Sequence, residues 1–158
     1  MKLHTTSEVI SLAKKLENES AKFYENLSLE CVRKEEDKEL LLSFARENRK
    51  NITQIERAYY GVITDAIEGC FAFDIEADEY ALETTLMEKA ACSGVLNRAV
   101  EIEEKMIKFY SEAAEQSKSL MADVPATFVT IAKKRTARVP RLKSLLEKED
   151  SVKEESNI

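Results

Sequence analysis

Two glutamates in matching surroundings are the residues of this chain best suited to chemistry. Glu17 and Glu103 each precede a Phe-Tyr pair by the same spacing, and the two pairs end at Tyr24 and Tyr110. Carboxylates are hard oxygen ligands that suit iron and other divalent metals, and they also accept strong hydrogen bonds from a buried cation. The two glutamates are therefore candidates either for a metal centre or for a buried ion-pair network.

The repetition of this segment predicts a duplicated fold. Residues 17–24 reappear as residues 103–110, and a second long segment of helical composition follows each copy. Two copies of a helical hairpin make a four-helix bundle, and this bundle would hold both glutamates at the centre of its core. We therefore expect an all-α protein built from two duplicated helical hairpins.

Each long segment carries an apolar seam whose members are spaced alternately three and four residues apart, as in bundle packing. The seams predict helices at about residues 6–31, 37–60, 94–118 and 124–147. Short loops join the helices within each hairpin, whereas a long crossover over residues 62–93 joins the second helix to the third. A connection of this length allows those two helices to run parallel.

Local signals predict where the helices start, stop and bend. Thr5 and Glu8 have the spacing of a capping box at the start of the first helix. Gly61 is expected to end the second helix, and Pro140 is expected to kink the fourth.

The length and composition fit one domain. The chain has 158 residues, of which 44% are hydrophobic, and this is enough to bury a core. We expect the bundle to occupy residues 1–148 and a polar, frayed tail to occupy residues 149–158. Residues 78–91 have helical composition and predict a short helix within the crossover.

Charge and hydropathy exclude several classes of function. The net charge of −6 argues against general nucleic-acid binding, which needs a basic surface. No apolar run approaches the ~20 residues of a membrane span, and the N-terminus lacks the apolar stretch of a secretory signal. We expect a cytoplasmic protein.

Cys31, Cys70 and Cys92 are widely spaced, and no Cys-x-x-Cys motif occurs. This excludes a rubredoxin-type iron site and a zinc ribbon. We expect three reduced thiols, as in cytoplasmic proteins, with one reactive thiol as the alternative.

The motif Glu-x-x-x-x-x-Phe-Tyr on the first and third predicted helices resembles the rubrerythrin branch of the ferritin-like superfamily. Residues 44–51, Phe-Ala-Arg-Glu-Asn-Arg-Lys-Asn, are similar to the second-helix motif of that family, Leu-Ala-x-Glu-Glu-x-x-His. In topology the resemblance covers nearly the whole chain. It implies a ferritin-like four-helix bundle with a di-iron centre held by a Glu from each of two helices and a Glu-x-x-His from each of the others.

The ligand positions of that family are only partly kept. Glu17 and Glu103 match the ligands from the first and third helices, but both histidine positions and both second glutamate positions are changed. The four positions are occupied by Asn48 and Asn51 in the second helix and by Arg135 and Arg138 in the fourth. Arginine stays cationic and offers no lone pair to iron. The single histidine, His4, precedes the first helix, where we expect it to be solvated.

A shift of the second helix by one residue would offer Glu47 and Lys50 instead. That shift would turn the apolar positions Leu41 and Ile55 away from the core, so we reject it. In the fourth helix no neighbouring register offers a carboxylate.

The preferred interpretation is an internal salt bridge that occupies the space of the lost metals. Aligning the four seams places Glu17, Asn48, Glu103 and Arg135 in one cross-section, with Arg138 as a second cation. We expect each tyrosine to pack in the seam with its hydroxyl on a glutamate.

The expected function is accordingly a non-catalytic structural, regulatory or interaction module with no cofactor. The alternative, implied by the resemblance, is a metal-binding oxidoreductase of peroxidase or ferroxidase type. In that case Glu17 and Glu103 would hold iron or another divalent metal, such as a weakly bound Mg²⁺ or Mn²⁺. A ligand pocket between the helices is a third interpretation.

Two kinds of protein partner are considered. The family resemblance and the exposed apolar helix faces predict a homodimer. The basic face of the fourth helix, formed by Lys133, Lys134, Arg141 and Lys143, is expected to be solvated, and its alternative is the docking of an acidic helix from an unidentified partner protein.

Overall fold

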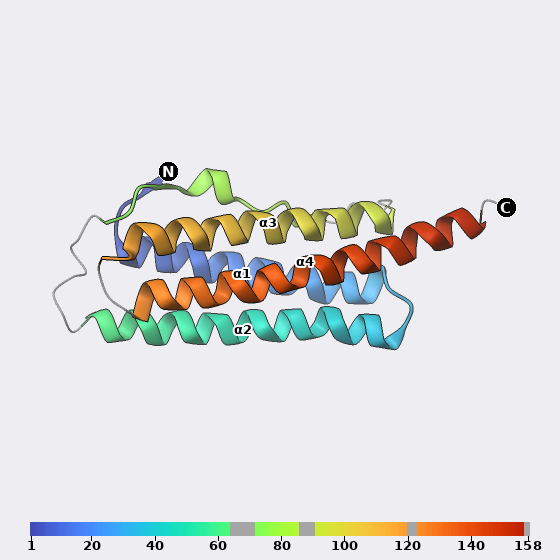
Figure 1. Ribbon diagram of the computed structural model, residues 1–158, viewed down its shortest axis with the longest axis horizontal. Helices are drawn as coiled ribbons and strands as arrows, with labels where there is room; N and C mark the ends of the chain where they lie inside the picture. The colour runs from blue at the N-terminus through green and yellow to red at the C-terminus, as the bar shows by residue number, and fades with distance from the viewer. Residues whose placement is uncertain (64–71, 86–90, 120–122, 157–158) are drawn as a thin grey trace.

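Four long helices lie side by side in the computed structural model, which describes residues 1–63, 72–85, 91–119 and 123–156 (Figure 1). The helices are α1 (Thr6–Glu30), α2 (Glu35–Ile63), α3 (Cys92–Ser117) and α4 (Asp123–Ser156). The prediction of an all-α helical bundle is confirmed.

The helices form two antiparallel pairs. α1 is antiparallel to α2, and α3 is antiparallel to α4. The helices α2 and α3 run in the same direction (Figure 1). Besides these pairs, α1 packs on α3 and α2 packs on α4, so α1 and α4 lie diagonally across the bundle. A long side chain on α4 can therefore reach α1 only through the centre of the core.

The predicted capping box is confirmed at the start of α1. The Thr5 hydroxyl accepts a hydrogen bond from the backbone N–H of Glu8, at 3.2 Å, and the Glu8 carboxylate accepts one from the backbone N–H of Thr5, at 3.1 Å. These bonds satisfy two polar groups that the first turn of a helix leaves without partners.

Two helices are longer than expected. Gly61 does not end α2, which continues to Ile63, since a single glycine in a helix costs only about 1 kcal/mol relative to alanine. The expected frayed tail after residue 148 is also wrong, because α4 continues to Ser156. No glycine or proline interrupts the chain between Pro140 and that residue, and the helix continues on both sides of Pro140.

The crossover differs most from the expectation. Its described part begins with β2 (Ile75–Glu76), which pairs antiparallel with β1 (Lys2–Leu3) at the N-terminus. A single 3₁₀ turn, η2 (Ala77–Tyr80), follows, and residues 81–85 have no regular structure, so the helix expected at residues 78–91 does not form in this part. Tyr80 accounts for this path, because its buried ring packs edge-on against Phe109 of α3 and fixes the chain to the bundle.

The predicted seams of α1 and α3 face the core. Every member of both seams is buried, including the polar ones. They are Ile10, Ala13, Glu17, Ser20, Tyr24 and Leu27 in α1, and Leu96, Ala99, Glu103, Met106, Tyr110 and Ala113 in α3. The apolar packing of the bundle is thus interrupted at its centre by charged side chains.

Among the helices that the structure describes, none has the length and hydropathy needed to cross a lipid bilayer.

Candidate functional site

One cross-section of the bundle contains a charged or amide side chain from each helix. Glu17 of α1, Asn48 of α2, Glu103 of α3 and Arg135 of α4 are all completely buried. We call this cross-section the central layer. The helices bring these four side chains together because each occupies a seam position, so packing of the apolar neighbours forces the polar groups inward.

Arg135 forms hydrogen bonds with the other three side chains of the central layer. Its Nε and Nη2 lie 3.2 and 2.8 Å from the two carboxylate oxygens of Glu17. Its Nη1 lies 2.8 Å from both oxygens of Glu103. Nη2 also donates to Ser20 Oγ at 3.1 Å and to Asn48 Oδ1 at 3.2 Å. One guanidinium therefore binds all four oxygens of the two glutamates.

Arg138 supplies a second buried cation one helical turn further along α4. Its Nη1 lies 3.1 Å from Glu103 Oε1 and its Nη2 lies 2.8 Å from Glu47 Oε1. The backbone oxygen of Phe44 accepts a further bond at 3.2 Å. The guanidinium carbon is 4.9 Å from the ring centre of Phe44 and 5.7 Å from that of Tyr24. Aromatic faces attract a desolvated cation, so these rings stabilise the charge.

The two tyrosines bind the glutamates crosswise. The Tyr24 hydroxyl donates to Glu103 Oε1, and the Tyr110 hydroxyl donates to Glu17 Oε1, both at 2.6 Å. Each hairpin thus contributes a tyrosine to the carboxylate of the other hairpin. These are short bonds to an ionised acceptor, which are stronger than bonds between neutral groups.

The protonation states follow from burial and from neighbouring charge. Burial alone would raise the pKa of Glu103, but Arg135 and Arg138 outweigh it and lower that pKa below 4.5. Burial alone would lower the pKa of Arg135, yet the carboxylates of Glu103 and Glu17 raise that pKa well above its usual range. Burial and the adjacent carboxylates raise the pKa of Tyr24 and Tyr110 well above 10.0. Glu103 is therefore an anion, Arg135 a cation, and the tyrosines are neutral donors.

The two asparagines differ sharply in their partners. The Asn48 amide donates to the backbone oxygen of Glu17 at 3.1 Å and also to Ser20 Oγ, while its oxygen accepts from Arg135. Asn51, one turn along α2, is equally buried, but neither side-chain atom has a hydrogen-bond partner among the described residues. Such a group retains most of its desolvation cost.

The donor set does not fit the di-iron centre that the family resemblance implies. Both carboxylates are committed to Arg135, and the remaining ligand positions hold amides and guanidiniums. Two guanidiniums beside the carboxylates would also repel a divalent cation. Within the described parts of the chain, no three His, Cys, Asp or Glu side chains are grouped closely enough to hold a metal ion.

Glu47 also takes part in the ion-pair network of Arg138, although we rejected the helix register that would place Glu47 in the core. It lies next to Asn48, with its side chain 35% exposed, and it binds Arg138 from the edge of the core. The sequence contains one indication of its role. Arg138 is a second buried cation, and it needs a carboxylate in addition to those of Glu17 and Glu103. His4 is exposed as expected, with its Nδ1 at 3.1 Å from the backbone oxygen of Phe73. Cys70 lies outside the described residues.

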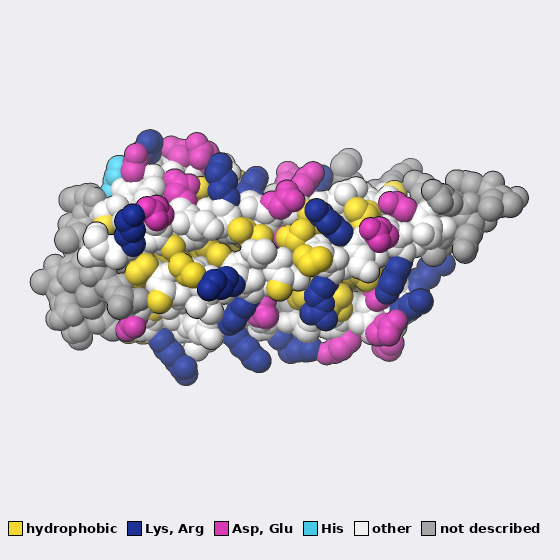
Figure 2. Space-filling model, in the orientation of Figure 1, with side chains coloured by type: hydrophobic (Ala, Val, Ile, Leu, Met, Phe, Trp, Pro, Cys, Tyr) yellow, Lys and Arg dark blue, Asp and Glu magenta, His cyan; other side chains and the backbone are white. Residues whose placement is uncertain are grey.

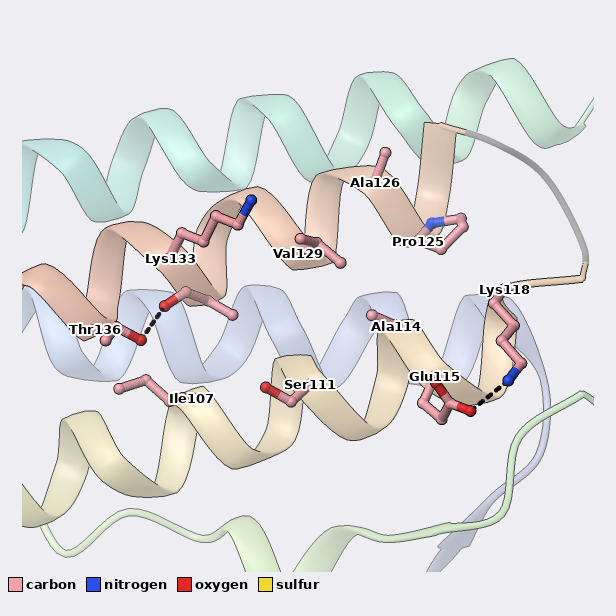
Figure 3. A pocket seen from close by; sticks show the side chains of 11 residues that line it. Ile107, Ser111, Ala114, Glu115, Lys118, Pro125, Ala126, Val129, Lys133 and Thr136 are labelled. Atoms are coloured by element: carbon pink, nitrogen blue, oxygen red, sulfur yellow. Dashed lines mark hydrogen bonds and ion pairs between the residues drawn. The ribbon is translucent and has the colours of Figure 1, made fainter.

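A separate groove of about 490 Å³ runs along the surface between α3 and α4. Figure 3 shows one wall formed by side chains of α3, such as Ile107, and the other by side chains of α4, such as Val129. Three of its polar side chains are bonded locally: Thr136 donates to the backbone of Ala132, and Glu115 pairs with Lys118. In the space-filling view, hydrophobic side chains follow this line between the two helices (Figure 2).

The chain matches no known family model, and neither a curated protein nor a solved structure is significantly similar to it.

Proposed function

We propose that this protein is a rubrerythrin-like member of the ferritin-like superfamily in which an arginine–glutamate network has replaced the di-iron centre. It acts as a non-catalytic structural or interaction module. The observation that carries this proposal is the binding of all four oxygens of Glu17 and Glu103 by the single guanidinium of Arg135. The parallel course of α2 and α3 supports the ferritin-like topology (Figure 1).

The crossed tyrosine–glutamate pairs support the proposed duplication of the hairpin. Tyr24 and Tyr110 occupy equivalent positions in the two copies of the repeated segment, and so do Glu17 and Glu103. Their two hydrogen bonds have the same length and exchange partners between the hairpins. A duplicated hairpin packed about an internal twofold axis produces this arrangement.

The network gives a physical reason for the loss of redox chemistry. A metal would have to displace guanidinium from the carboxylates, and the displaced arginine would then lie buried without a partner, which is costly. The charges of Arg135 and Arg138 balance those of Glu17 and Glu103 without any metal. The bundle would therefore be stable whatever the supply of iron.

Metal analysis of protein expressed in iron-rich medium tests the proposal. We expect well under one iron per chain in the purified parent protein, with no optical band of an oxo-bridged iron pair. A matched variant with Asn48→Glu, Asn51→His, Arg135→Glu and Arg138→His restores the ligand types of the family, and we expect it to gain iron. Two tightly bound irons in the parent would instead support the oxidoreductase alternative.

We further propose that the protein forms a homodimer through the groove between α3 and α4. Glu101 and Glu104 are exposed on α3, and the stretch of α4 from residue 124 to residue 146 contains basic residues but no acidic ones. A twofold axis along the bundle would place α3 of one copy against α4 of the other. Acidic positions would then meet basic ones around a shared apolar strip.

A further inference from the structure

Two cysteines that are far apart in the sequence meet at one end of the bundle. Cys31 is the C-cap residue directly after α1, and Cys92 is the first residue of α3. Both are free thiols of intermediate exposure. The Sγ of Cys92 lies 4.0 Å from the backbone oxygen of Glu30, whose peptide bond leads directly to Cys31.

The side chain of Cys92 also acts on the Cys31 thiol, in agreement with the contact between Cys92 and Glu30. Burial, followed by a hydrogen bond and a charge interaction with the Cys92 side chain, raises the pKa of Cys31 to about 12. The backbone of Cys31 is fixed at the end of the helix, because its N–H donates to the oxygen of Leu27 at 3.0 Å. The pair is therefore held together by the packing of α1 and α3.

A small reagent can reach Cys31 from solvent. Cys31 lines a surface hollow of about 170 Å³, together with residues of the α1–α2 turn and of α4. The charged residues of this lining are three basic side chains and two acidic ones, so the hollow does not repel an anionic reagent. They are Arg33, Lys34 and Lys148 against Asp37 and Glu149.

We propose that Cys31 and Cys92 form a reversible disulfide by exchange with a small-molecule disulfide, which would tie the end of α1 to the start of α3. The thiolate of one cysteine attacks the small disulfide, forms a mixed disulfide and releases one small thiol. The thiolate of the other cysteine then attacks the sulfur of the first and releases the second small thiol. The protein loses two protons and two electrons, and the small disulfide is reduced to two thiols.

The bond would join the two hairpins where the chain connects them only through the long crossover. It would close a loop of about sixty residues, and a loop of that size restricts the unfolded chain strongly. Oxidation would therefore stabilise the assembled bundle. This modification is independent of the proposed loss of the di-iron centre.

The test uses the full chain with Cys70→Ser, so that only the two neighbouring thiols remain. The reduced protein is incubated with oxidised glutathione, and free thiols, intact mass and proteolytic peptides are measured. We expect two thiols to disappear, the mass to fall by two hydrogen atoms and one linked peptide to contain both cysteines. We also expect the melting temperature to rise by roughly 5–10 °C, and dithiothreitol to reverse every change.

Cys31→Ser and Cys92→Ser, each in the same background, are the matched controls. Each should stop at a mixed disulfide with glutathione and show no such rise in melting temperature. The proposal is overturned if the two-cysteine protein also stops at mixed disulfides. It is equally overturned if the native protein forms the internal bond no more readily than the same chain unfolded in urea.

Discussion

At the scale of single residues, the exchange of metal ligands for arginine changes how buried carboxylates are neutralised. A metal ion is a mobile charge that can be lost, whereas the guanidinium of Arg135 is covalently attached and remains protonated when buried. Its planar donors meet Glu17 and Glu103 on separate edges. The centre of the bundle therefore contains a permanent polar cluster that is almost fully hydrogen-bonded.

Removal of Arg135 should destabilise the protein severely. Arg135→Ala leaves two buried carboxylates without their main cation, and we expect the free energy of unfolding to fall by about 3–5 kcal/mol. Denaturant melts followed by circular dichroism measure this change. Arg49→Ala is the matched control, since Arg49 forms an exposed ion pair with Glu25 and should cost less than about 1 kcal/mol. Equal effects of the two variants would refute the central role of the buried network.

The tyrosines of the central layer should resist ionisation. Because the pKa of Tyr24 and Tyr110 is higher in the folded chain than in the unfolded chain, the folded state holds more protons at high pH. The free energy of unfolding should consequently fall as the pH rises above 10.0. In a spectrophotometric titration, both should ionise only when the helical signal is lost.

The double variant Tyr24→Phe/Tyr110→Phe provides the check on this assignment. It should remove the two tyrosines whose ionisation accompanies the loss of the helical signal. Ionisation of all five tyrosines together near pH 10, with the circular dichroism intact, would contradict the buried hydrogen bonds.

The two buried asparagines should respond in opposite ways to the same change. Asn48→Leu removes an acceptor of Arg135 and a donor to Ser20 Oγ, so we expect a loss of about 1–3 kcal/mol. Asn51→Leu removes an amide with no hydrogen-bond partner among the described residues, and we expect unchanged or higher stability. Urea titrations of both variants measure the difference. Similar losses at the two positions would mean that Asn51 has a partner, such as a buried water or a bound ligand.

The members of the site that lie on seams could be predicted from the sequence, while those beside the seams could not. The seam alignment placed Glu17, Glu103 and Arg135 in one cross-section of the bundle. Helical periodicity fixes the face of the helix on which a residue lies and its position along the helix axis. The seam alignment did not identify Glu47, because its side chain reaches the network from a neighbouring face of the helix, which periodicity does not describe. Asn48 has hydrogen-bond partners, whereas Asn51 has none in the part of the chain that the structure describes, and this difference depends on atomic distances that spacing cannot supply.

At the scale of the elements, local sequence signals predicted which segments are helical, but they predicted the ends of the helices poorly. The capping box at Thr5 is a short-range motif, and it formed as predicted. By contrast, the pairing of β1 with β2 joins segments more than seventy residues apart, and two-residue strands leave almost no sequence signal. The extension of α4 to Ser156 was likewise not predicted, because the residues after Glu149 are mostly polar and do not continue the apolar seam.

The crossover shows how long-range contacts override local propensity. Residues 77–85 have the composition of a helix, but Tyr80 is buried against α3 and its hydroxyl donates to Glu112. Burial of an aromatic ring is worth more than the small differences in helix propensity over a few residues. The segment therefore follows the surface of the bundle instead of coiling on itself.

At the scale of the whole molecule, the arrangement of surface side chains favours association over small-molecule binding. The groove between α3 and α4 is apolar, long and open, and Lys and Arg side chains gather over and below α4 in the same view (Figure 2). Thr136 bonds to its own helix and Glu115 pairs with Lys118, so these polar groups do not converge on a ligand. A second helical surface is the occupant that such a groove fits best.

Val129→Glu should therefore dissociate the proposed homodimer while leaving the fold intact. Val129 is 42% exposed on the α4 wall of the groove, so the added carboxylate costs little in the monomer but would be buried in the dimer. Light scattering across a concentration series should show a dimer for the parent and a monomer for the variant. Leu29→Glu is the matched control, because Leu29 is 79% exposed on α1, away from the groove, and this variant should remain dimeric. A parent protein that is monomeric at every concentration would rule out the interface, because the groove would then have no second copy to cover it.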